Sequence, residues 1–175
     1  DNKYKLALSH FSTLENVGVS QEDLSIAKKG QLYCFHHLKN PQSTIKYAKK
    51  VLYIDDINTK TEEDAYLFLG QSYKEVGQVD SAEQFFQKVL QLTKSIAAAE
   101  AKYSICEIYF NKKDYSTCEA QIMELVQQKP AYDFWLAKGI ILLGDNFTAL
   151  EDYFNAKHSL NSIIENYDGP EKELI

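Results

Sequence analysis

A short pattern of small and aromatic residues recurs five times along this chain and constrains its fold more than any other feature. Successive copies start 37, 38, 36 and 38 residues apart. A fixed period of about 34 residues is typical of helix–turn–helix solenoids. The pattern therefore predicts an all-α, right-handed superhelical solenoid of antiparallel helix pairs, with about four and a half repeats. The small residues that open the second helix of each copy, and from which the spacing is counted, are Ala7, Thr44, Ala82, Cys118 and Ala156.

The clearest copy resembles the tetratricopeptide repeat, whose pattern is W-x2-L-G-x2-Y, then A-x3-F, then a closing Pro. In this copy Gly70 occupies the Gly position, Ala82 the Ala position and Lys94 the place of the Pro. The next copy has Cys106 and Cys118 at the Gly and Ala positions. The copies at residues 32–48 and 140–160 follow the pattern less closely. The full match in the clear copy is Tyr66, Leu69, Gly70, Tyr73, Ala82 and Phe86.

Residues 131–167 show a second, finer resemblance. The runs 132–139, 143–145 and 163–164 are similar to long multi-repeat proteins of the Gram-negative cell envelope, often named after the Tol–Pal system. This resemblance implies a scaffold role in the periplasm or cell envelope.

Helical periodicity and capping residues place the expected helices along the whole chain. Asn40 followed by Pro41 predicts one helix start, Thr61 with Asp64 predicts a capping box, and Pro130 predicts another start. We expect first helices at 22–38, 61–76, 96–110 and 131–148, and second helices at 41–54, 81–92, 115–128 and 152–167. A lone second helix is expected near residues 1–17, so that residues 1–175 form a single solenoid.

That lone helix has no first-helix partner, and residues 171–175 look like the start of a further helix. We therefore expect the chain to be part of a longer array. The apolar side of the lone helix, formed by Leu6, Leu8 and Val17, is expected to be covered by another molecule or by the tail 171–175.

Composition narrows the function classes. A net charge of −6 argues against general nucleic-acid binding, which needs a basic face. Three cysteines do not form a disulfide framework. The longest apolar stretch, residues 134–143, is interrupted by Lys138 and Gly139 and is shorter than the roughly 20 residues that cross a bilayer. No Gly-rich phosphate loop is present, and no cofactor is implied.

Cysteine and histidine residues at two places are candidates for a metal site, a catalytic residue or a disulfide bond. Cys34, His36 and His37 lie together, but adjacent helical histidines point about 100° apart and a zinc site needs three or four converging ligands. We therefore expect neither a metal site nor a catalytic residue here. The repeat pattern places Cys106 near Cys118, and we expect two buried thiols in contact without a bond.

The resemblance to the tetratricopeptide repeat also implies a binding surface. In that family the inner groove is lined by first-helix residues at offsets 2, 5, 9, 12 and 13 of each repeat, which we call groove positions. The implied partner is a protein segment, either an extended peptide or a helix, or else neighbouring repeats of the parent chain. The groove residues that we expect to contact it are Lys29, Tyr33, Leu67, Gln71, Lys74, Tyr103, Glu107, Phe110, Asn111, Ile141 and Asp145.

Three functions stay open at this point. The favoured one is a non-catalytic protein–protein interaction scaffold in envelope assembly. A glycan-binding module is favoured if Trp135, or exposed Tyr33 and Tyr103, cluster in a shallow pocket. An enzyme requires a deep pocket that holds Cys34 beside an oriented histidine.

Overall fold

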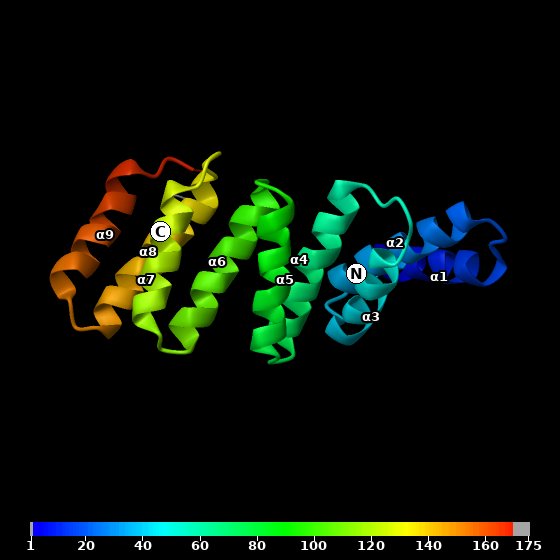
Figure 1. Cartoon of the computed structure of the whole chain (residues 1–175), viewed down its shortest axis with the longest axis horizontal. Coiled ribbons are helices and arrows are strands. Elements are labelled where there is room, and N and C mark those ends of the chain that lie inside the picture. Colours follow the sequence, from blue (N-terminus) through cyan, green and yellow to red (C-terminus); the bar gives the residue numbers. More distant parts are fainter. Residues whose placement is uncertain (1, 170–175) are drawn as a thin grey trace. The chain divides into compact units, whose positions relative to one another are not determined.

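The structure is a computed structural model that describes residues 2–169. In that range the chain forms nine helices and no strand (Figure 1). The chain divides into two compact units, Asp1–Leu92 and Thr93–Ile175, and each is described by itself. The helices are α1 (Asn2–Val17), α2 (Gln21–His37), α3 (Pro41–Leu52), α4 (Thr59–Glu75), α5 (Val79–Leu92), α6 (Ile96–Asn111), α7 (Tyr115–Gln127), α8 (Asp133–Ala149) and α9 (Tyr153–Asn166).

The helix starts predicted from capping residues are correct at one position and wrong at two others. Asn40 caps α3 by accepting from the Ser43 amide at 3.1 Å, with Pro41 in the first turn, as predicted. The predicted capping box at Thr61 is wrong, because α4 begins two residues earlier and Asn58 caps it. Pro130 likewise lies outside a helix, since α8 begins at Asp133.

The first unit contains α1 to α5, and each of these helices packs on the next one along the chain. Helix α2 also contacts α4, so the two complete first helices of this unit meet directly. At the crossing of α4 and α5, the ring of Phe86 covers Gly70, and an added Cβ on Gly70 would lie 2.5 Å from two ring atoms. Ala82 and Phe86 are fully buried. The small residues predicted at this crossing thus leave room for an aromatic ring.

A polar network anchors α1 to α2 and α3. The carboxylate of Glu15 accepts hydrogen bonds from Gln31 Nε2 at 2.7 Å, Tyr47 Oη at 3.0 Å and Lys50 Nζ at 2.7 Å. These donors come from α2 and α3, so one side chain connects three helices. Burial raises the pKa of Glu15, but the hydrogen bonds from Lys50, Gln31 and Tyr47 outweigh it and lower the pKa to about 2.

The apolar side expected on α1 is partly open. Leu6 is 62% and Val17 66% exposed, whereas Leu8 is half-buried. The tail 171–175, which was one expected cover, lies outside the described residues.

The second unit contains α6 to α9, and α8 packs on both helices of the preceding pair, α6 and α7. A buried cluster joins these three helices through Cys106, Cys118, Ile122, Leu125 and Leu142. The thiol of Cys118 donates to the Cys106 carbonyl oxygen at 3.5 Å, and both cysteines are free. The predicted contact between the two residues is therefore present.

Candidate functional site

The predicted groove residues divide between the two units. Five lie on α2 and α4 in the first unit, and six lie on α6 and α8 in the second. Because α2 contacts α4 and α6 contacts α8, each unit brings its own set onto neighbouring first helices. We call these surfaces the α2–α4 face and the α6–α8 face, and describe each separately.

The α2–α4 face ends in a pocket of about 440 Å³. Gln71 is the predicted groove residue that lines it, and His36, His37 and Glu75 line it from other groove positions. The turn between α2 and α3 completes the wall. Sequence reasoning missed this turn because the repeat pattern assigns binding positions to first helices alone. The turn and second-helix residues that it missed are Lys39, Asn40, Pro41 and Thr44.

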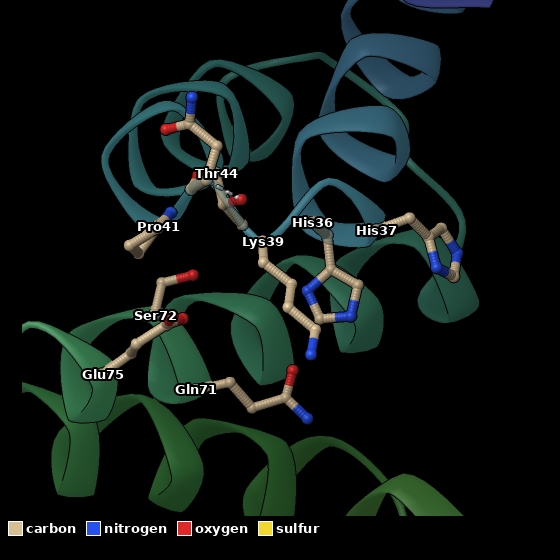
Figure 2. A pocket seen from close by; sticks show the side chains of 9 residues that line it. His36, His37, Lys39, Pro41, Thr44, Gln71, Ser72 and Glu75 are labelled. Atoms are coloured by element: carbon tan, nitrogen blue, oxygen red, sulfur yellow. Dashed lines mark hydrogen bonds between the residues drawn. The ribbon is translucent and has the colours of Figure 1, made fainter. Parts of the chain in front are cut away.

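The pocket wall mixes both charges with neutral polar groups. In Figure 2 the Lys39 side chain runs past the ring of His36 toward Gln71, while Ser72 and Glu75 lie on the other side, below Pro41. His37 lies beside His36, on the side away from Ser72 and Glu75 (Figure 2). Such a wall offers an ammonium, a carboxylate, an amide and a hydroxyl to a polar ligand such as a peptide backbone.

The His36 imidazole is a fixed, neutral part of this wall. Its ring stacks on Phe68 with centroids 3.7 Å apart and planes 10° from parallel. Burial lowers the pKa of His36 to about 4, with a smaller lowering from His37 that is partly opposed by Asp64. The ring therefore carries no charge at neutral pH, and it contributes hydrogen-bonding nitrogens rather than a cation.

Tyr33, another predicted groove residue, is held by internal contacts. Its hydroxyl donates to Asp64, which also accepts from Lys60 Nζ at 2.7 Å. Its ring meets the edge of Phe68 at a centroid distance of 5.5 Å. Since Asp64 is used in this way, it does not form the capping box predicted with Thr61. Tyr33 is half-buried, so part of its side chain stays accessible to a ligand.

The α6–α8 face is built around aromatic rings. Tyr103 of α6 lies 5.6 Å from Trp135 of α8, and Phe134 lies 4.9 Å from Trp135, between ring centroids. We call Tyr103, Phe134 and Trp135 the aromatic cage. Lys138 places its ammonium over all three rings. The sequence did not predict that Phe134 and Trp135 take part in this face. Both residues come before the groove positions of α8, so the repeat pattern does not assign them to the groove.

Two predicted groove residues are less exposed than expected. Tyr103 is 8% and Leu67 is 6% exposed, so Tyr103 does not offer the exposed ring that favours a glycan-binding module. The reason is packing, since Trp135 and Lys138 cover the Tyr103 ring. Burial raises the pKa of its phenol, and Glu107 and Asp145 raise it further. Truncating the Tyr103 side chain therefore disturbs the packing of α6 against α8, in addition to any effect on partner binding.

The other predicted residues are accessible to different degrees. Asn111 and Asp145 are exposed, while Lys29, Lys74, Glu107 and Ile141 are half-buried. Phe110 is half-buried and meets Tyr115 edge to face at 5.9 Å. The α6–α8 face thus combines aromatic rings with side chains of both charges.

Neither metal ligation nor membrane insertion is indicated in the described part of the chain. Between residues 2 and 169, no group of three or more His, Cys, Asp or Glu side chains is arranged to hold a metal ion. No helix in that range is both long and apolar enough to cross a bilayer. His36 and His37 face each other edge to face at 5.5 Å, without further ligands from this set.

Comparison with known proteins identifies the repeat. A family model described as "Tetratricopeptide repeat" matches residues 63–96, which include most of α4, all of α5 and the Gly70–Phe86 crossing. Residues 63–96 are thus similar to a tetratricopeptide repeat. No curated protein sequence matches the chain at a significant level.

Solved structures extend the likeness to the fold of nearly the whole chain. The structure is similar to that of MamA, with a TM-score of 0.75 and 14% identity, covering 94% of this chain and 88% of that one. It is also similar to BtubC (BKLC) from P. vanneervenii, with a TM-score of 0.66 and 14% identity, covering 95% and 74%. Both are tetratricopeptide-like helical solenoids, so the predicted all-α fold class is confirmed. At this identity the likeness concerns the fold alone.

Proposed function

We propose that this chain is a non-catalytic protein-interaction scaffold that binds an extended peptide or a helix on its first-helix faces. The observation that carries the proposal is the pocket at the end of the α2–α4 face, where side chains from two repeats converge. Tetratricopeptide repeats and their solenoid relatives support an interaction role. The pocket's Lys39, Gln71, Ser72 and Glu75 suit the alternating donors and acceptors of a peptide backbone.

A setting in the periplasm or cell envelope is part of the proposal. It is supported by the resemblance of residues 131–167 to envelope multi-repeat proteins. The proposed role there is assembly of envelope proteins, with the partner bound through several weak contacts on each face.

The two other functions lose their main support. A glycan-binding module needs open aromatic faces, but the Lys138 ammonium lies over the rings of the aromatic cage. An enzyme built on Cys34 needs an accessible thiol that ionises readily, but Cys34 is buried and burial raises its pKa.

Affinity capture from an extract of source cells, followed by mass spectrometry, tests the proposal. Lys39→Ala with Gln71→Ala removes two pocket side chains, and Lys88→Ala with Gln84→Ala makes the same changes at exposed positions of α5. We expect the pocket pair to lose at least one captured protein that the α5 pair retains, with equal helicity in both. Equal capture by both pairs contradicts the proposal, and capture of nothing by the unmodified chain contradicts it too.

A further inference from the structure

The α6–α8 face already holds a cation. Lys138 Nζ lies 4.3 Å from the ring centroid of Tyr103, 5.0 Å from Trp135 and 5.7 Å from Phe134. A cation within about 6 Å of a ring centroid is attracted by the negative face of the ring. Three rings around one ammonium thus form a site with the geometry of a cation-binding cage.

Two of the three rings of the cage are held by packing against the rest of the unit. Tyr103 and Trp135 belong to different helices, and both pack against the buried cluster of the second unit. Phe134 stands at 75° to Trp135 and is 40% exposed, so its side of the cage is open to solvent. The cage can therefore keep its shape when the ammonium inside it changes.

Charge on the same face favours an incoming cation. The groove positions of α6 and α8 include three acids, Glu100, Glu107 and Asp145, and one base, Lys138. Glu107 and Asp145 act electrostatically on Tyr103, which places their charges near the cage. A cationic partner is therefore attracted to this face, and an acidic partner is repelled by it.

We propose that the aromatic cage binds a lysine or arginine side chain of the partner segment, and that Lys138 occupies the cage until the partner arrives. Lys138 sits on a flexible four-carbon stem, so it can leave the cage for solvent without a change in the helix. This inference rests on the proposed function, because it specifies the chemistry of the segment bound on the α6–α8 face.

The test uses the chain's single tryptophan, Trp135, as a fluorescent reporter inside the cage. The probes are a glycine–serine nonapeptide with three arginines and the same peptide with three glutamines or three glutamates. Lys138→Met removes the ammonium from the cage while keeping an unbranched side chain of similar length. Lys157→Met makes the same charge change at an exposed position of α9 and serves as the matched control.

We expect the arginine peptide to change Trp135 fluorescence saturably, and the glutamine peptide to leave it unchanged. Lys138→Met should tighten arginine-peptide binding by about threefold to tenfold over Lys157→Met, the range of a partly desolvated cation–π contact. Equal affinities in the two variants overturn the inference, as does preferential binding of the glutamate peptide to Lys138. If a captured partner depends on Lys39 and Gln71 but no arginine response occurs, the inference fails while the proposed function stands.

Discussion

The ring of Phe86 occupies the space where a side chain on Gly70 would begin. Its Cδ1 and Cε1 atoms lie 2.5 Å from the position of an added Cβ, and Phe86 itself is fully buried. A rigid buried ring cannot move aside, so the first helix of this repeat requires glycine here. The contact explains why a residue that weakens helices lies in the middle of α4.

Gly70→Ala should therefore destabilise the first unit, although alanine favours a helix by about 1 kcal/mol over glycine. We expect a net loss of about 1–3 kcal/mol from overpacking, measured by urea denaturation. Gly144→Ala is the control, because Leu160, the side chain 2.9 Å from its added Cβ, is 37% exposed and can move. Equal effects of the two changes would show that the Phe86 contact is not what excludes a side chain.

The second small residue of that crossing gives a related prediction. Ala82 is fully buried, so Ala82→Leu should lower stability by about 1–3 kcal/mol. Ala120→Leu, at an exposed position of α7, should change stability by less than about 0.5 kcal/mol. A thermal melt of Ala82→Leu that coincides with that of the unmodified chain would be inconsistent with the repeat frame.

The Glu15 network predicts how stability depends on pH. Its pKa is about 2 in the folded chain against 4.5 for a free side chain, so folding favours the ionised form. The stabilisation is complete above pH 4.5 and is lost as pH falls from 4.5 toward 2. Glu15→Gln should lower stability at pH 7 and flatten the acid loss in this window. Glu165→Gln, at an exposed position of α9, should leave the acid loss as it is. If Glu15→Gln behaves like this control, the network does not stabilise α1.

The cysteines should be unreactive while the chain is folded. All three are buried, and burial raises the pKa of Cys106 to about 12 and of Cys118 to about 11. Because the thiolate is the reactive form, we expect slow labelling by a thiol reagent at pH 8 and rapid labelling of three thiols in denaturant. Ser116→Cys provides an exposed thiol as a positive control. Fast native labelling of Cys106 or Cys118, or an intact mass that is lower by two hydrogens, would contradict this.

Features that depend on local spacing could be predicted from the sequence. The repeat frame placed Gly70, Ala82 and Phe86 at one crossing and Cys106 beside Cys118, because residues at fixed offsets of two short helices must meet. Helix starts were harder. Asp64 was expected to cap α4 with Thr61, but it bonds Tyr33 of another helix, and no local pattern contains that partner.

The candidate site depended more on contacts between distant residues. The repeat frame assigned the predicted groove residues to first helices, and they lie on α2, α4, α6 and α8. It did not show that Lys39 and Pro41 complete the pocket, since the turn reaches α4 only in three dimensions. It also did not show that Tyr103 is buried, because the residue that covers it, Trp135, lies 32 residues later on another helix. Burial of a groove side chain is thus decided by the neighbouring repeat.

The central claim is that partners bind on the first-helix faces. Photocrosslinking of the chain in its source cells tests this claim most directly. A photoreactive benzoylphenylalanine would replace Gln71 or Asp145 on those faces, and Lys88 or Lys157 at exposed positions of the second helices α5 and α9. The account predicts crosslinks to a partner protein from positions 71 and 145, and few or none from 88 and 157. Crosslinks from 88 and 157 alone, or equally from all four positions, would contradict it.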